Sequence, residues 1–506
     1  MDRLMGTESE YGLAIEQTEP GELPEEARRL IAAYPDTCSG NWDYGAESPL
    51  RDLRGFRAPP MSSDPRDARY DRPARRALSP AEEHQDRLLP NGARLYHDHG
   101  HPEYSTPECR SLWELIAQER AGERIVWHCA QAYARATGRT VVIYKNNTDF
   151  HGMSYGAHEN YLLGRRLPFE RLSAGLMPFL VTRMLYAGAG KVGLEEESGT
   201  TAQVDYQLSQ RADFFSEPVG IGTLYHRPLI NTRDEPHANA RRYRRLHLIV
   251  GDANLSDYAL ALKLGSTALV LGVLEAGYAP PVVLQDPIAS LQTLSRAKWD
   301  APNRWLLTEE SGEKISALTI QRAYRLAAWE LYAGRDEESD WVLAEWARVL
   351  DLLEAGSFEQ LAQRLDWAAK LRLLAEFVAA EGLDWQRDRE LLQSLDLAYH
   401  ELDPERGLAR GLEQEGRLRR LADEAAIERA ISQPPGDTRA ALRGECVRRF
   451  ADQIESLSWG QVSLRSDGKR VILDLNDLVG RVDGRLLAER QQLRPEELAQ
   501  LIADTH

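Results

Sequence analysis

Apolar and polar positions along the chain repeat with two different periods, and the period separates predicted strands from predicted helices. Strands are predicted at residues 3–16, 92–99, 140–146 and 244–250. Helices are predicted at residues 20–34, 111–137 and 256–276, and the pattern from Ser316 to about Arg429 is mostly helical. Antiparallel strands with helices packed on one side predict an α+β fold class.

Proline and glycine mark the expected ends of these elements. Pro102 is expected to end the second strand, and Gly138 is expected to stop the long second helix. Pro434 and Pro435 predict a boundary between a catalytic domain, residues 1–433, and a small C-terminal domain, residues 434–506. That tail holds a predicted hairpin over 461–475 with its turn at Asp467-Gly468, and a helix near 495–503.

Residues 36–90, between the first two long strands, have little periodicity and are rich in Pro, Arg and Asp. They predict a loop, and a loop of this length inside a compact domain is often functional. Its opening, WDYGAESPLRDLRGF at 42–56, carries aromatic side chains that favour an ordered start. Because both ends join strands of the predicted site, the hypothesis is that this loop gates a bound ligand.

Composition narrows the class of protein. The chain has 506 residues, 42% hydrophobic, and a formal net charge of −17, which argues against nucleic acid or an anionic membrane as the main partner. The longest apolar stretch, near 264–274, is short for a membrane helix, and no leader is recognised before MGTESEYG. The four cysteines form no CxxC pair and are interpreted as reduced thiols. We expect a cytoplasmic protein.

Strand alternation sorts the polar residues of HDHGHPEYSTPEC, residues 97–109. Side chains alternate between the two faces of a strand, so Arg94, Tyr96 and Asp98 share one face. His97 and His99 lie on the other face and are expected to pack or hydrogen-bond there. A zinc site built from His97, His99 and His101 is the disfavoured alternative, because alternation does not bring the three together.

The first strand places two acids on one face. Glu8 and Glu10 in GTESEYG repel each other unless cations lie between them. Surface acids are the ordinary alternative, but the apolar flanks favour burial. Carboxylate oxygens in this number suit Mg²⁺ or Mn²⁺ better than zinc.

Two further segments add histidines and arginines. In the segment GAHENYLL, His158 and Asn160 share a face, and in RRLHLIV Arg245 and His247 do. With Arg233 and Arg241 nearby, the second segment indicates a phosphate-binding wall. Acids for hard cations, arginines for phosphate and one central Asp together describe a nucleotide site on an antiparallel sheet, of the carboxylate–amine ligase kind.

Several of these segments are long and specific enough to carry a family resemblance. MGTESEYG, NGARLYHDHGHPEYSTPEC, KNNTDFHGMSYGAHENYLL, SQRADFFSEPVG, NTRDEPHANARRYRRLHLIVGDAN and LDWAAKLRLL resemble the family that contains the ligase and the deamidase of Pup, the prokaryotic ubiquitin-like protein. The resemblance covers nearly the whole chain and implies a fold similar to glutamine synthetase and glutamate–cysteine ligase.

The resemblance also implies roles for single residues. It makes Asp98 the catalytic residue, as nucleophile or as general base. The implied metal site is formed by Glu8, Glu10, Tyr96, Glu103, His158 and His247, with His237 as a nearby alternative to the last. The implied nucleotide site is formed by Arg94, Thr106 and Trp459, and the phosphate-binding wall adds Arg245 to it. Because Pup is acidic in this family and the chain has a net charge of −17, Pup binding requires a local basic groove, to which Arg211, Arg233 and Arg241 are assigned. The alternative is that several of these arginines pair with surface acids.

The implied reaction is hydrolysis of the C-terminal side-chain amide of Pup, either deamidation of a terminal Gln or cleavage of the isopeptide bond to lysine. The implied cofactors are ATP, retained as ADP and phosphate, and Mg²⁺. The implied partners are Pup or a Pup-like modifier, pupylated proteins and, functionally, the bacterial proteasome, with the enzyme itself a monomer.

Three alternatives remain beside the hydrolase. The first is a Pup–protein ligase, disfavoured because the chain has GTESEYG, DHGHPEY and the long 36–90 insertion, which the resemblance associates with the hydrolase. The second is an inactive Pup-binding adaptor, which the complete set of acids argues against. The third is a small-molecule amine ligase, which would not need the long loop.

Overall fold

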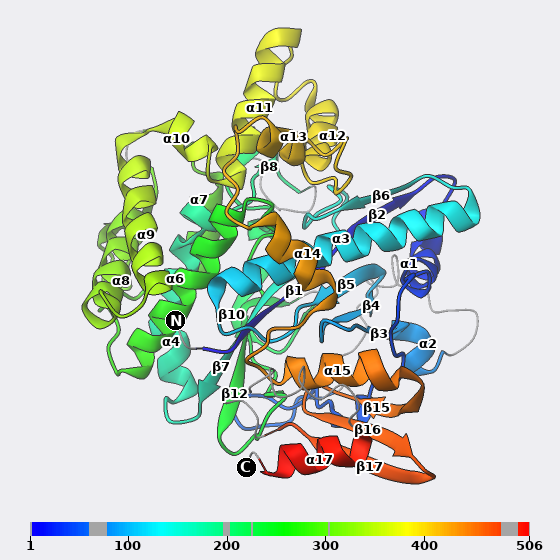
Figure 1. Ribbon diagram of the computed structural model, residues 1–506. Helices are drawn as coiled ribbons and strands as arrows, with labels where there is room; N and C mark the ends of the chain where they lie inside the picture. The colour runs from blue at the N-terminus through cyan, green and yellow to red at the C-terminus, as the bar shows by residue number, and fades with distance from the viewer. Residues whose placement is uncertain are drawn as a thin grey trace.

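The computed structural model describes residues 3–59, 78–195, 203–223, 226–301, 304–476 and 494–504 (Figure 1). The middle of the predicted 36–90 loop, residues 60–77, lies outside this description. Its start and end are described, and they include the short helix α2 (Pro80–His84). The opening of the segment is placed by backbone bridges of Ser39 to Leu88 and of Trp42 to Leu457, which confirms an ordered start.

The framework is an eight-stranded sheet in the order β10-β11-β12-β7-β1-β5-β4-β3, antiparallel except for the β10–β11 pair. Its strands are β1 (Met5–Glu10), β3 (Arg87–Leu88), β4 (Arg94–Asp98), β5 (His101–Ser105), β7 (Ala157–Gly164), β10 (Phe215–Gly220), β11 (Arg227–Asn231) and β12 (Tyr243–Leu248). The first strand lies in the middle, so side chains from distant parts of the sequence line up beside it.

The strand β5 corrects one prediction. Pro102 does not end the preceding strand but lies inside β5, opposite His97. The strand β4 ends instead at a tight turn in which His99 and Gly100 both have positive φ, 43° and 94°. Two residues with positive φ between antiparallel strands form the hairpin turn whose twist matches the sheet. Glu103 is thereby placed opposite Tyr96.

Helices cover one face of the sheet. The long helix α3 (Leu112–Thr137) begins at the N-cap Ser111 and ends at Gly138, whose φ is 72°, as the sequence predicted. The helix α1 (Leu23–Ala32) packs beside it. The remaining helices of the main body are α4 (Phe169–Thr182), α5 (Met184–Ala187), α6 (Asp257–Glu275), α7 (Pro287–Arg296), α8 (Ala317–Tyr332), α9 (Glu337–Ala355), α10 (Phe358–Ala362), α11 (Asp366–Glu381), α12 (Arg389–Tyr399), α13 (Leu408–Gln414) and α14 (Glu424–Ser432).

The helix α6 is the core of the molecule. Among the described helices it alone is long and apolar enough to cross a membrane, but 94% of its apolar window is buried within the protein. Three pairs of short strands flank the main sheet: β2 (Gly12–Ile15) with β6 (Val141–Tyr144), β8 (Lys191–Val192) with β9 (Tyr206–Gln207), and β13 (Leu306–Thr308) with β14 (Lys314–Ser316). The predicted α+β class is confirmed.

The C-terminal elements form a layer below the sheet in Figure 1: α15 (Ala440–Phe450), β15 (Ile454–Leu457), β16 (Gln461–Ser466), β17 (Lys469–Asp474) and α17 (Pro495–Asp504). The predicted hairpin is confirmed, with Asp467 and Gly468 at φ 47° and 77°. These elements share an apolar cluster that also takes in Trp42 and Leu88 of the main body. The division into two domains at 434 remains a prediction.

The contact between α3 and the sheet generates a stability prediction. Gly122 of α3 lies over Tyr104 of β5, and a Cβ added to Gly122 would lie 2.3 Å from Tyr104 Cδ1. Gly122→Ala should lower the free energy of unfolding by about 1–3 kcal/mol, because the clash outweighs the better helix propensity of alanine. The measurement is denaturant unfolding followed by circular dichroism.

The matched control is Gly411→Ala in α13, where an added Cβ meets nothing within 4 Å. That change should raise the free energy of unfolding by about 0.5–1 kcal/mol. Equal effects of the two changes would contradict the assigned packing of α3 on β5.

Candidate active site

The face of the sheet that the helices leave open is the floor of a cavity of about 460 Å³. Alternate residues of five strands point into it. From the predicted sites these are Glu8, Glu10, Arg94, Tyr96, Asp98, Glu103, His158, Arg245 and His247. The structure thus brings together the predicted catalytic residue, all six predicted metal residues and three predicted nucleotide residues, the third being Trp459.

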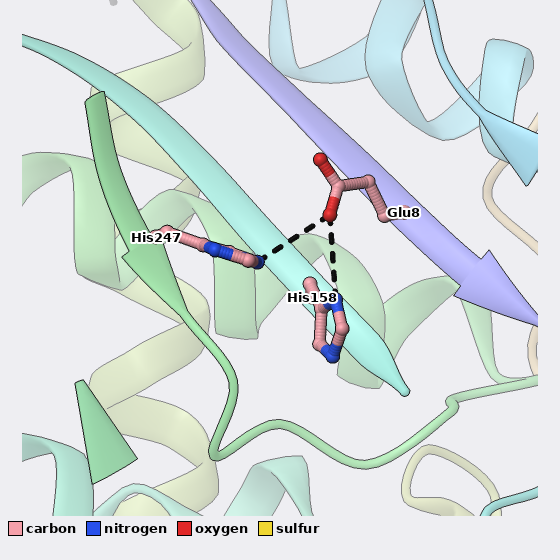
Figure 2. Close-up of side chains that lie close together, drawn as sticks. All are labelled: Glu8, His158 and His247. Carbon is pink, nitrogen blue, oxygen red and sulfur yellow. Dashed lines mark hydrogen bonds and ion pairs between the residues drawn. The ribbon is translucent and has the colours of Figure 1, made fainter. Parts of the chain in front are cut away.

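One group in the cavity joins an acid to two histidines (Figure 2). Glu8 Oε2 lies 3.3 Å from His158 Nδ1 and 3.4 Å from His247 Nε2, and the two rings meet edge to face at 4.9 Å. Arg245 Nη1 lies 3.1 Å from Glu8 Oε1. Burial raises the pKa of Glu8, but His247, His158 and Arg245 together hold it well below its usual range. Glu8 is therefore an anion at neutral pH.

The His247 side chain is a neutral imidazole rather than an imidazolium. Burial, followed by nearby Arg245, lowers the pKa of His247 to about 3. Neither ring nitrogen makes a hydrogen bond within the part of the chain that is described, although both are buried. A neutral imidazole with a free nitrogen beside a carboxylate is a donor set that fits a divalent cation. His247, not His237, completes this group.

A second group consists of carboxylates alone. Oxygens of Glu10, Asp98 and Glu103 all lie within 4.8 Å of one another, and Tyr96 donates a hydrogen bond of 2.5 Å to Glu103 Oε1. Burial, together with Asp98, Glu8 and Glu10, holds the pKa of Glu103 well above its usual range. Like charges at this spacing require a proton or a cation, so these oxygens also fit a hard divalent ion.

The histidines near Asp98 divide between the two faces differently from the prediction. His97 is buried on the helix side, where its Nε2 accepts a hydrogen bond from Gly100 N, as expected. His99 was expected there as well, and that was wrong. Its left-handed turn conformation sends the ring to the cavity, where Nδ1 lies 2.9 Å from Asp98 Oδ2. The disfavoured zinc set of three histidines does not form.

This ion pair sets the charges at the predicted catalytic residue. Burial raises the pKa of Asp98, but His99 acts against it and the net pKa lies well below the usual range. Asp98 in turn raises the pKa of His99 to about 9. At neutral pH the pair is therefore a carboxylate facing an imidazolium, and the carboxylate is ionised without further help.

The predicted nucleotide residues lie along one side of the cavity. Arg94 and Arg245 line the cavity itself, while Thr106 lies in a smaller adjoining pocket of about 90 Å³. Trp459 borders both spaces, and its ring meets Trp42 edge to face at 5.4 Å. Residues from three distant parts of the chain therefore surround one continuous region.

Two of the three arginines predicted to bind Pup line the cavity, and the third does not. Arg211 is fully buried, donates to the backbone oxygens of Ile249 and Gly251, and has a pKa lowered to about 10 by burial and by Arg227. Arg233 lines the cavity, whereas Arg241 is exposed and does not. Arg211 and Arg233 therefore line the same cavity, together with Arg227 and Arg245, and the assignment of these side chains to Pup stays a prediction.

Sequence reasoning missed several residues of this site. Asp86 and Glu47 contact Arg94, and His84 and Arg227 line the cavity. The first three belong to the 36–90 segment, which has no periodicity from which their direction can be deduced. The only available signal was the aromatic content of residues 42–56.

Comparisons with known proteins agree on one family. The sequence profile described as Pup-ligase protein matches residues 3–463. A depupylase of Acidothermus cellulolyticus is 40% identical over 481 residues, covering 93% of this chain and 92% of the relative. A Pup deamidase/depupylase of Mycolicibacterium smegmatis is 39% identical, covering 93% of both chains. A Pup–protein ligase of Corynebacterium jeikeium is 41% identical over 79% of this chain and 88% of its own.

Two solved structures are similar across most of the chain. One is the complex between Pup and its ligase PafA, with a TM-score of 0.78 and 32% identity over 99% of this chain and 92% of that one. The other is PafA in complex with ADP, with a TM-score of 0.73 and 34% identity over 89% of this chain and 95% of that one. Their fold is the one described above.

The crowded carboxylates generate a prediction. In EDTA, Glu103→Gln should raise the free energy of unfolding by about 1–3 kcal/mol, because a neutral amide relieves a buried acid that faces other acids. Added Mg²⁺ should stabilise the parent more than the variant, because the variant offers one fewer anionic ligand. Thermal unfolding across a Mg²⁺ titration measures both effects.

The matched control is Glu381→Gln, which changes an exposed acid of α11 and should leave both measurements unchanged. A variant that is less stable than the parent in EDTA would show that Glu103 is not under repulsion.

Proposed function

The chain belongs to the Pup-ligase protein family, and from that premise we propose that it is an ATP-dependent hydrolase of Pup. It is an enzyme of the Pup deamidase/depupylase type, acting on carbon–nitrogen bonds. Its substrates are the C-terminal side-chain amide of Pup and the isopeptide bond that joins Pup to a lysine of a target protein. The observation that carries this conclusion is the match to hydrolases over 93% of the chain.

The ligase is the alternative, and one similarity supports it. The Pup–protein ligase relative has 41% identity, but over 79% of this chain rather than 93%. The solved ligase structures establish the shared fold and do not separate the two reactions. The GTESEYG strand and the long 36–90 segment favour the hydrolase.

Nucleotide use is supported by the ADP bound to the similar ligase. In this chain Arg94 and Arg245 would face the phosphate groups, while Thr106 and Trp459 would border the rest of the nucleotide in the adjoining pocket. Retention of ADP and phosphate between turnovers is part of the proposal.

Mg²⁺ is the proposed metal. The residues that would hold it are Glu8 with His158 and His247, and Glu10 with Glu103, while Tyr96 acts through its hydrogen bond to Glu103. When bound, the ion supplies positive charge that neutralises these carboxylates and stabilises negative charge on an amide oxygen. The His247 nitrogens, which make no hydrogen bond and of which Nε2 lies 3.4 Å from Glu8 Oε2, and the raised pKa of Glu103 support this assignment.

Asp98 is the proposed catalytic residue. His99 holds one of its oxygens at 2.9 Å, and the ion pair keeps the group ionised. Such an oxygen either attacks the amide carbon or takes a proton from the attacking water. If the oxygen attacks the carbon, the carbon–nitrogen bond breaks, the amine or ammonia leaves with one added proton, and water then hydrolyses the resulting anhydride, which gives the carboxylate product and regenerates Asp98. If it takes a proton from water, the hydroxide adds to the carbon, the proton passes to the departing amine or ammonia, and the remaining product is a carboxylate.

The partners follow from the substrate. We propose that Pup, or a Pup-like modifier, and pupylated proteins bind at the mouth of the cavity, with Arg233 on its wall and Arg211 in its depth. The assignment of Arg241 to Pup also remains a proposal. A cytoplasmic monomer linked functionally to the bacterial proteasome fits these substrates.

The deciding experiment separates hydrolase from ligase. The enzyme receives Pup ending in Glu, a target protein and ATP in one reaction, and a purified Pup conjugate with ATP in another. We expect the conjugate to be cleaved, with far fewer ATP molecules consumed than bonds cut. Accumulation of conjugates with one ADP released per bond would establish a ligase instead.

A second test concerns Asp98. Asp98→Asn should lower the rate of conjugate cleavage by at least about 10³-fold, the loss typical of removing a nucleophile or general base. ADP affinity, measured by calorimetry, should change little, because Asp98 belongs to the carboxylate group rather than to the nucleotide side of the cavity. Near-parental turnover would rule out the assigned role.

A further inference from the structure

The guanidinium of Arg94 is held in place by contacts on several sides. Its Nε donates a hydrogen bond of 2.7 Å to Asp86 Oδ1. Its central carbon lies 4.0 Å from the ring centre of Trp42 and 4.0 Å from that of Tyr96. These contacts fix the plane of the group and occupy its Nε edge, so only the Nη groups are left for a ligand in the cavity.

The two acids near Arg94 differ in how firmly they are held. Asp86 is buried, with 2% of its surface exposed, and its other oxygen accepts a hydrogen bond from the Tyr44 hydroxyl. Glu47 lies on the cavity wall, with 34% of its side chain exposed and its Oε1 3.8 Å from Arg94 Nη1. The first contact is a charge-assisted hydrogen bond, and the second is a loose ion pair.

Apart from Tyr96, the side chains that contact Arg94 are Trp42, Glu47 and Asp86, which lie in the segment between α1 and β3. The Trp42 indole donates to Glu47 Oε1 at 2.7 Å, so the loose acid is itself oriented by the aromatic residue that covers Arg94. The segment therefore determines both the direction of the arginine and the charge that a ligand meets there.

We propose that Asp86 is a positioning residue that aims Arg94 at the phosphate groups of a bound nucleotide, and that Glu47 is the counter-ion those phosphates displace. This inference rests on the nucleotide binding of the proposed function and adds two residues to it. A phosphate that pairs with the Nη groups replaces the weak Glu47 contact, whereas the Asp86 hydrogen bond persists in both states.

Opposite effects are expected from removing the two charges. Asp86→Asn should raise the dissociation constant for ADP about tenfold, the factor that corresponds to one oriented charge-assisted hydrogen bond. Glu47→Gln should lower that constant about threefold, because it removes a competing anion while the amide oxygen still accepts from Trp42.

The matched control is Asp52→Asn. Asp52 lies in the same segment, is 1% exposed, and accepts a hydrogen bond of 2.6 Å from the Thr232 hydroxyl, without contacting Arg94. It should leave ADP affinity unchanged, even if it lowers the thermal stability of the protein.

The experiment is calorimetric titration of the full chain and the three variants with ADP and Mg²⁺, beside thermal unfolding of each. Opposite shifts for Asp86→Asn and Glu47→Gln support the inference. Shifts in the same direction, or a loss of affinity in Asp52→Asn equal to that in Asp86→Asn, would overturn it. If Asp86→Asn does not fold, the test depends on Glu47→Gln, and an unchanged or weaker ADP affinity of that variant overturns the inference.

Conjugate cleavage by the parent distinguishes this inference from the proposed function. A parent that binds ADP with the expected variant pattern but cleaves no conjugate refutes the hydrolase and leaves the role of Asp86 and Glu47 intact. A parent that cleaves conjugates while the variants bind ADP equally well refutes only the inference. Absence of ADP binding by the parent overturns both.

Discussion

The alternation of β1 between a helix-covered face and an open face is the constraint on which the site depends. Glu8 and Glu10 point into the cavity, while Thr7 and Ser9 point the other way and both donate hydrogen bonds to Glu119 of α3. A shift of one residue in this central strand would exchange the two sets. Because the strand pairs with β5 and β7 on its two sides, the same alternation also fixes Glu103 and His158.

On the helix-covered face of the sheet, buried charges of opposite sign compensate one another. Lys145 Nζ lies 2.8 Å from Glu119 and 2.9 Å from Glu123, and all three side chains are almost completely buried. Breaking such a pair by removing one partner typically costs about 3–5 kcal/mol, because the other charge is left buried and alone. The network therefore specifies one register for β1, and this register places Glu8 and Glu10 on the open face.

The same alternation explains which parts of the site could be predicted from the sequence. The faces of Glu8, Tyr96, Asp98, His158 and His247 were correct because each residue lies in a regular strand, where direction depends only on parity. The predicted face of His99 was wrong because a hairpin turn follows Asp98, and side chains in a turn do not alternate between the two faces of the sheet. The strand end predicted at Pro102 was wrong because proline, which lacks a backbone N–H donor, is still tolerated in a strand where the neighbouring strand needs no hydrogen bond from it.

The contacts around Arg94 were beyond the reach of periodicity, because an aperiodic segment gives no rule for where its side chains point. Asp86 is placed beside Arg94 by the adjoining strand β3, which pairs with β4, and Trp42 by a backbone bridge to Leu457. Trp42 contacts both Arg94 and Trp459, so one side chain from the first tenth of the chain joins β4 to the C-terminal segment. The sheet thus places its acids by parity, whereas the orientation of Arg94 depends on tertiary contacts.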